Sequence, residues 1–257
     1  MKHTIMVAAN QLLRRFGYRA VRWPKALQVE EGREVRFSLL HEIGLLHLQR
    51  QPATRPFRFV QIGSLVLPGH YDLVEIARKF GDYRGVLIDA QPSVVEQLEA
   101  KYGSDPSVTI LHRAITVSAG TATFYSVAND DKRFPKWVQG IASLDRRNIT
   151  KFERELPGIS ASIVETPVQS TTLTDVIRQC GLADIDLVMI DAEGHDLEIL
   201  KTLSLSVLQP RLIFLEHSHL ATRDREEAVS LLLAHGYRVA CLPCDLLASR
   251  DESHALR

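Results

Sequence analysis

The chain has 257 residues, of which 45% are hydrophobic and 24% charged, and its 31 basic side chains balance its 31 acidic ones. This composition is typical of a soluble globular protein, and no motif for binding nucleic acid is visible. No apolar run reaches the roughly 18 residues of a membrane span, and three cysteines argue against a disulfide framework. We therefore expect a cytoplasmic protein with no signal peptide, no membrane span and no nucleic-acid partner.

Residues 1–55 are predicted to form an N-terminal helical extension. Apolar side chains recur there at helical spacing, namely Leu12, Leu13, Phe16, Leu39, Leu40, Ile43 and Leu46. The first 60 residues also carry a surplus of basic over acidic side chains, which indicates a solvated basic face or, as an alternative, an acidic substrate. Such helices could pack on the rest of the chain or on a second subunit, so a homo-oligomer stays open.

Strand and helix patterns alternate over residues 56–257, which predicts βαβ units and a parallel sheet. Strands are expected at 57–62, 86–88, 108–111, 187–190, 211–215 and 237–242. Helices are expected at 71–80, 92–102, 173–180, 196–203 and 225–235. We therefore expect one α/β domain with a doubly wound sheet.

A polar and basic stretch at about residues 128–165 interrupts this alternation, after a possible strand at 121–127. Long excursions inside compact domains are usually functional lids or binding loops. Phe134 and Trp137 lie in it. Their rings could stack on a substrate or form a local core. We expect this insertion to choose the substrate.

Several predicted strands end on residues that can do chemistry. They are Gly63 with Ser64, Asp89, Asp191 with Glu193, and Glu216 with His217. Ligands bind beyond the carboxyl ends of the strands in such sheets, so these residues should surround one site. The alternatives are that Asp191 caps the following helix and that Asp89 is a turn residue before Pro92. The chain lacks a Gly-x-Gly-x-x-Gly turn and a P-loop, which argues against a nicotinamide dinucleotide site.

Six motifs follow one another along the chain. They are Phe59-Val-Gln-Ile-Gly63, Gly85-Val-Leu-Ile-Asp89-Ala-Gln-Pro92, Ala114-Ile115, Ser170-Thr-Thr-Leu173-Thr-Asp175, Asp186-Leu-Val-Met-Ile-Asp191-Ala-Glu193-Gly194 and Leu212-Ile-Phe-Leu-Glu216. In this order and spacing they resemble the FkbM family of S-adenosylmethionine-dependent methyltransferases, over about residues 57–250. The resemblance implies a Rossmann-like class I methyltransferase fold with one antiparallel strand near the C-terminus. It also implies methyl transfer to an oxygen, often of a sugar or other glycan, or of a small natural product.

The resemblance also implies positions for the site. The cofactor pocket would be formed by Gly63, Ser64, Asp89, Ala90, Arg113, Ala114 and Asp191. In that mapping Asp89 receives the ribose hydroxyls, Asp191 and Glu193 lie beside the reactive methyl group, and residues 141–146 face the substrate. Two departures stand out: the loop 64–69 carries bulky residues at Leu65 to Leu67 where the family has small and acidic residues and another Gly, and Asp89 replaces the usual Glu. The alternative function is therefore a binding or scaffold module on a cofactor-free methyltransferase fold.

The chemistry needs a group that removes the proton of the acceptor hydroxyl. The candidate catalytic residues are Asp191, Glu193, His195 and His217. His195 could instead be an exposed residue of a first helical turn. A Mg²⁺ or Mn²⁺ ion is a second hypothesis, because oxygen ligands with one imidazole suit such ions. Its expected ligands are Asp191, Glu216 and His217, which His219 could join; Glu216 and His217 could instead pair with loop arginines.

Overall fold

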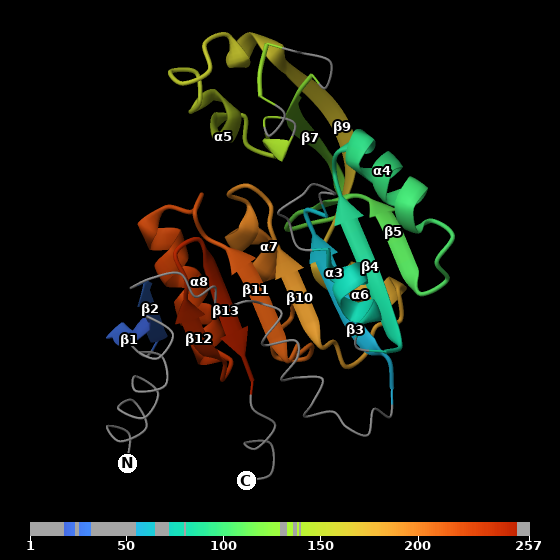
Figure 1. Ribbon diagram of the computed structural model, residues 1–257, viewed down its shortest axis with the longest axis vertical. Helices are drawn as coiled ribbons and strands as arrows, with labels where there is room; N and C mark the ends of the chain where they lie inside the picture. The colour runs from blue at the N-terminus through green and yellow to red at the C-terminus, as the bar shows by residue number, and fades with distance from the viewer. Residues whose placement is uncertain are drawn as a thin grey trace.

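The computed structural model describes residues 18–23, 26–31, 55–64, 72–79, 81–128, 133–135, 138 and 140–250. A nine-stranded sheet forms the body of the molecule, and a four-stranded sheet rises above it (Figure 1). No helix in these ranges is long and apolar enough to cross a membrane. The loop 65–69 and Trp137, which the sequence analysis singled out, lie outside the described residues.

The large sheet is doubly wound and mostly parallel. Its order is β1-β2-β12-β13-β11-β10-β3-β4-β5. Five adjacent strands run parallel, and they end with β5 at one edge of the sheet; they are β3 (Phe57–Ile62), β4 (Tyr83–Asp89), β5 (Val108–His112), β10 (Leu187–Ile190) and β11 (Leu212–Glu216). The strand β13 (Asp245–Ser249) runs antiparallel to β11 and to β12 (Arg238–Cys241). The predicted fold class, including the antiparallel strand near the C-terminus, is confirmed.

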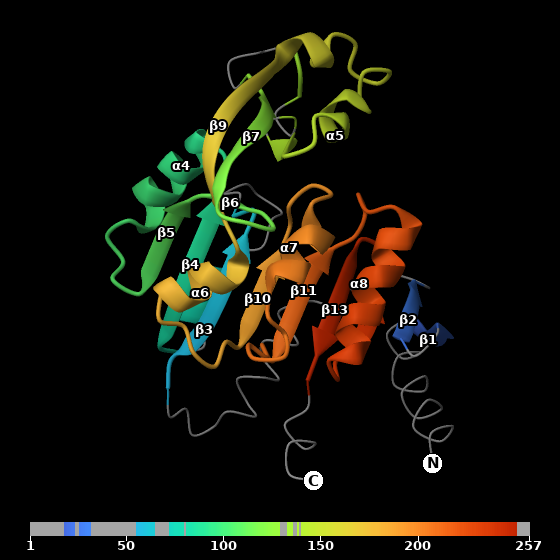
Figure 2. The same cartoon turned by 180° about the vertical axis from the view of Figure 1, so that it is seen from behind.

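Helices cover both faces of this sheet (Figures 1 and 2). On one face α3 (Leu73–Arg78) and α4 (Pro92–Tyr102) pack on Phe59 and Leu87. On the other, the neighbouring residues Val60 and Ile88 contact the core of the remaining helices, α6 (Leu173–Gln179), α7 (Asp196–Thr202) and α8 (Thr222–Ala234). Successive strand side chains point to opposite faces. Both faces are buried, which explains why these strands are almost wholly apolar in sequence.

The N-terminal segment departs from the sequence prediction. The strands β1 (Tyr18–Trp23) and β2 (Ala26–Glu31) form an antiparallel pair. Strand β2 also pairs in parallel with β12, which places the pair at the edge of the sheet. The helical prediction is therefore wrong for these residues. Tyr18, Val21, Trp23 and Val29 are residue types that favour strands, a signal that the leucine spacing around them obscured. The apolar residues used for the helical prediction, at 12–16 and 39–46, lie outside the described residues.

The insertion is built on a β-ribbon. The strands β7 (Gly120–Val127) and β9 (Ile163–Thr171) pair antiparallel along their length and project above the large sheet, with β6 (Ala114–Ile115) and β8 (Ala142–Ser143) flanking them. We call the described residues between β7 and β9 the lid. It contains α5 (Arg147–Thr150) and a 3₁₀ turn, Ile159–Ser162.

The lid has a hydrophobic core of its own, formed by Val127, Val138, Ile141, Ile149 and Ile159. Phe134 packs against this cluster, and the guanidinium of Arg133 lies 5.3 Å from the centre of its ring. Phe134 therefore belongs to the local core that the sequence analysis gave as one of its two readings.

A buried ion pair fastens the start of the sheet. Asp186 is fully buried just before β10, and the guanidinium of Arg55 donates to its two carboxylate oxygens at 2.8 and 3.0 Å. The backbone N–H of Arg58 donates to the same carboxylate at 2.9 Å. The segment that leads into β3 is thus held against β10 by charge-assisted hydrogen bonds.

Candidate active site

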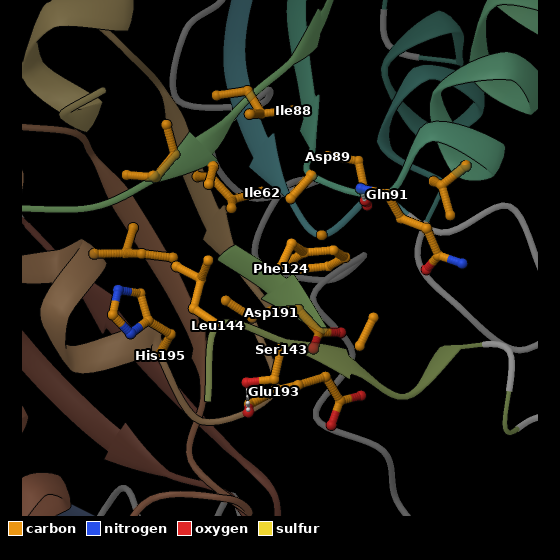
Figure 3. Close-up of a pocket in the computed structure, with 18 of the residues that line it drawn as sticks. Ile62, Ile88, Asp89, Gln91, Phe124, Ser143, Leu144, Asp191, Glu193 and His195 are labelled. Atoms are coloured by element: carbon orange, nitrogen blue, oxygen red, sulfur yellow. Dashed lines mark hydrogen bonds between the residues drawn. The ribbon is translucent and has the colours of Figure 1, made fainter. Parts of the chain in front are cut away.

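A cavity opens beyond the carboxyl ends of β3, β4 and β10, beneath the lid (Figure 3). It encloses about 710 Å³, part of which is open to solvent. The structure brings most of the predicted site residues to its wall, namely Gly63, Asp89, Ala90, Arg113, Ala114, Asp191, Glu193 and His195.

Asp89 ends β4 and is held in place by backbone amides. Its two carboxylate oxygens accept hydrogen bonds from Ser64 N at 3.1 Å and from Gln91 N at 2.8 Å. Burial raises the pKa of Asp89 to about 6, and these two amides oppose that rise. Each oxygen retains a lone pair for a ligand. An amide-fixed carboxylate at this strand end can therefore receive a pair of hydroxyl groups.

Ser64 serves this arrangement from outside the cavity wall. Its side chain is buried and donates to Gln61 O at 3.0 Å, so its hydroxyl faces back along β3. Gly63, just before it, has a φ of +75°, a conformation that glycine adopts without strain. Ser64 was predicted to bind the cofactor. In this structure it contributes to the site through its backbone N–H, which orients Asp89.

Acidic side chains gather at the ends of β10 and β11. Burial, followed by the charges of Glu216, Asp196 and Glu193, raises the pKa of Asp191 well above its usual range. Burial and the charge of Glu216 also raise the pKa of Asp245 to about 6. Asp191 therefore retains its proton more readily than an ordinary aspartate.

The turn between β10 and α7 is organised by Asp196. Its buried carboxylate accepts from Ala192 N and Gly194 N, both at 3.0 Å, and burial raises its pKa to about 7. Between these two amides Glu193 has a φ of +51°, in the left-handed region that side chains rarely adopt. Helix α7 begins after His195 without a side-chain cap, so Asp191 does not cap it, and Asp196 instead holds the turn that precedes it.

Glu193 contacts His219, which the sequence analysis named only as a residue that could join the metal ligands. His219 Nε2 lies 3.0 Å from Glu193 Oε2, and Lys151 of the lid lies 3.0 Å from His219 Nδ1. A lysine ammonium only donates, so Nδ1 accepts and Nε2 carries the hydrogen that faces Glu193. The bond to Glu193 raises the pKa of His219.

The two other candidate histidines have different surroundings. His195 lines the cavity, its Nε2 is buried without a partner, and burial lowers its pKa. Its ring turns away from the Asp191 carboxylate in the view of Figure 3. His217 is buried, and its ring Nε2 lies 2.9 Å from Leu242 O. The backbone N–H of His217 donates to Cys244 O. The structure therefore does not bring His217 into the cavity, but uses it to hold the β12–β13 turn.

The position of His217 also separates the expected metal ligands. Within the described ranges, the residues whose ligand atoms all lie within 4.8 Å of one another are Glu193, Glu216 and His219. The expected set of Asp191, Glu216 and His217 is not brought together in this way, because the ring of His217 points to the β12–β13 turn.

Several wall residues were not expected from the sequence. Gln91 follows Asp89, and Phe124 on β7 closes one side of the cavity (Figure 3). The lid also contributes Ala142, Ser143 and Leu144 to the wall. These three were expected, because they fall within the stretch 141–146 that was predicted to face the substrate. The signal for Phe124 was its place in an alternating strand, which does not reveal which face meets the site.

The family model of the methyltransferase FkbM domain matches residues 60–239. The chain belongs to the FkbM methyltransferase family. It is therefore a member of a family of S-adenosylmethionine-dependent methyltransferases, with the Rossmann-like class I fold that the strand order and β13 display. No curated protein matches the chain.

Solved methyltransferases are similar in structure at low sequence identity. Precorrin-6y C5,15-methyltransferase from Geobacter metallireducens is 14% identical, with a TM-score of 0.38, and the match covers 84% of this chain and 92% of that one. Ribosomal protein L11 methylase from Lactobacillus delbrueckii subsp. bulgaricus is 10% identical, with a TM-score of 0.37, over 82% and 79% of the two chains.

Proposed function

We propose that this FkbM-family protein transfers a methyl group from S-adenosylmethionine to a hydroxyl group of a sugar or small natural product. The observation that carries the proposal is the convergence of Asp89, Asp191 and Glu193 on one cavity from the ends of separate strands. A carboxylate that is free to accept hydroxyls lies in the same cavity as carboxyl groups that can exchange a proton with an acceptor.

The residues in the cavity fit the cofactor that the family implies. Asp89 would accept the ribose hydroxyls, as its amide-fixed oxygens allow. Ala90, Ala114 and Phe124 provide apolar surface for a nucleoside base. When bound, the cofactor supplies a methyl carbon made electrophilic by its sulfonium. The chain must then hold the acceptor oxygen close to that carbon and accept its proton.

We assign the proton acceptor to Glu193. Its side chain lines the cavity, and His219 donates to one of its oxygens at 3.0 Å, which stabilises the charged carboxylate. Asp191 is less suited to this role because its raised pKa keeps it protonated, so we assign it a hydrogen bond to the acceptor. His195 is the second candidate for the base, because its unpartnered Nε2 is neutral at physiological pH.

The acceptor would lie between the sheet edge and the lid. Ser143 and Leu144 of the lid face the cavity together with Phe124 of β7. A wall that mixes apolar surface with one hydroxyl and several carboxyl groups suits a hydroxylated small molecule or glycan. Glu193 offers a carboxylate that can accept the proton of a weakly acidic hydroxyl group. This supports methyl transfer to oxygen rather than to carbon or nitrogen.

A divalent cation at this edge is a finer proposal. Glu193, Glu216 and His219 offer the oxygen and imidazole donors that Mg²⁺ or Mn²⁺ accepts. Lys151 opposes it, since the ammonium at Nδ1 leaves the hydrogen on Nε2, the atom that an ion would need. Retention of full methyl transfer after exhaustive chelation would rule the ion out of the reaction.

Two measurements test the proposed function. Calorimetry should show micromolar binding of S-adenosylhomocysteine to the wild type, and Asp89→Ala should weaken it by at least about tenfold. Transfer of tritium from labelled S-adenosylmethionine should then be followed over a panel of sugars, nucleotide sugars and phenols, with fragmentation spectra to distinguish O-methyl from C-methyl products. Absence of binding by the folded wild type would contradict the proposal and favour a cofactor-free binding module.

A further inference from the structure

The lid contacts the backbone of the turn that carries Glu193. Asn148 Nδ2, on α5, donates to the backbone oxygen of Glu193 at 2.8 Å. Ser143 Oγ, on β8, donates to the same oxygen at 3.3 Å, the contact drawn between these residues in Figure 3. Asn148 also donates to Ser143 Oγ at 3.1 Å, so the two lid side chains act on this oxygen as a pair.

These contacts fix one peptide unit at both ends. The oxygen of the peptide between Glu193 and Gly194 accepts from Asn148, and its N–H donates to the buried carboxylate of Asp196 at 3.0 Å. Rotation of this peptide would break both bonds. The packing is close, because a Cβ added to Gly194 would lie 2.9 Å from Asn148 Nδ2.

Glu193 needs such external support. Its φ of +51° lies where a β-carbon crowds the following carbonyl, and residues in this region persist only when their surroundings impose it. The direction of the side chain follows from that backbone conformation. In it, the carboxylate meets His219, which itself accepts a hydrogen bond from Lys151 of the lid. The lid therefore acts on both the backbone and the carboxylate of Glu193.

We infer that Asn148 is a positioning residue: through the Glu193–Gly194 peptide, the docked lid holds Glu193 in its left-handed conformation and aims its carboxylate into the cavity. The consequence for the reaction depends on the proposed role of Glu193 as proton acceptor. With that role, the contacts of the lid keep the proton acceptor in place at the cavity wall.

The variant Asn148→Asp tests this inference, because it keeps the shape of the side chain and replaces its donor by an acceptor. Amide NMR spectra of the ligand-free protein report directly on the turn. The Gly194 resonance should shift and its solvent exchange should accelerate by at least about tenfold, and the coupling between the amide and α protons of Glu193 should change. Ser143→Ala should shift the same resonances less, in the same direction.

Arg147→Ala is the matched control. Arg147 neighbours Asn148 on α5, but its side chain is 89% exposed and pairs with Asp145. This variant should leave the Glu193 and Gly194 resonances unchanged. Wild-type values for both residues in a folded Asn148→Asp protein would overturn the inference. If that variant does not fold, Ser143→Ala decides by the same readout.

The NMR readout needs neither cofactor nor acceptor, so its failure is distinct from failure of the proposed function. S-adenosylhomocysteine should bind Asn148→Asp within roughly a factor of ten of the wild type, because Asp89 and its amides lie on β4 and β3. A wild type that binds no S-adenosylhomocysteine would contradict the proposed function and leave the spectra to decide the positioning role.

Discussion

The backbone of Gly63 lies against the carbonyl of Asp191 so closely that a Cβ on residue 63 would stand 1.7 Å from that oxygen. The two residues follow β3 and β10, which are neighbours in the sheet, and the N–H of Asp191 donates to Ile62 O at 3.1 Å. This contact sets the floor of the cavity, because it brings the chain after β3 and the acidic turn after β10 together.

Gly63→Ala should therefore unfold or severely destabilise the protein, by at least about 3 kcal/mol. The substitution combines the strain of a positive φ with a collision against backbone. Gly181→Ala is the control, because Gly181 also has a positive φ, +61°, but nothing lies within 4 Å of its added Cβ. It should cost only about 1–2 kcal/mol in urea unfolding. Equal losses in the two variants would contradict the close contact.

The Arg55–Asp186 pair predicts a large effect far from the cavity. Asp186→Ala should lower the free energy of unfolding by about 3–5 kcal/mol, since it leaves the Arg55 guanidinium without its buried partner. Asp184→Asn should cost less than about 0.5 kcal/mol, because the Asp184 side chain is 76% exposed and 4.0 Å from Arg58, and asparagine tolerates the φ of +54° at this position. Denaturant titration of both variants measures the difference.

Asp245 predicts a pH-dependent gain. Its pKa is raised to about 6 in the folded protein, so the folded state binds a proton more readily than the unfolded state, and the charged form disfavours folding at higher pH. Asp245→Asn should stabilise the protein by roughly 1–2 kcal/mol at pH 8. The gain should shrink as the pH falls through 6 and vanish below 3.8, the unfolded-state pKa, where both states are protonated. Asp184→Asn, on the surface, should show no such trend in thermal unfolding.

Asp89 predicts the pH dependence of cofactor binding. Its pKa of about 6 means that the carboxylate is charged at pH 7.5 and largely protonated at pH 5. Because the charged form is the stronger acceptor of ribose hydroxyls, the affinity for S-adenosylhomocysteine should fall by about tenfold over this range. Asp89→Asn should bind weakly with little change over the same range. A wild-type affinity that stays constant would remove Asp89 from the site.

His217 and His195 should separate by substitution. His217→Leu should lower the free energy of unfolding by about 1–3 kcal/mol, because Leu242 O loses its partner, and should leave S-adenosylhomocysteine binding intact. His195→Ala should keep the fold and change only events in the cavity. Loss of cofactor binding in a folded His217→Leu protein would return His217 to the list of site residues.

The parts of the molecule that could be predicted are those determined by residues close together in the sequence. Buried parallel strands are short apolar runs, and those ending at Asp89 and Asp191 were located together with the edge on which they meet. The β1–β2 hairpin was missed because its strands are stabilised by β12, far along the chain. His219 was underrated and His217 overrated for one reason: both follow β11, and only the fold decides which ring faces Glu193. Asn148 gave no signal, since its partner is a backbone atom.

The position of β2 has a consequence for how the chain acquires its structure. Leu27 and Gln28 pair with Ala240 and Cys241, so β2 obtains this neighbour only after all the strands that lie between them in the sequence have been made. Closing that long loop is slow and costly in entropy. On the ribosome the central strands can assemble first, and the N-terminal hairpin completes the sheet as one of the last events of folding.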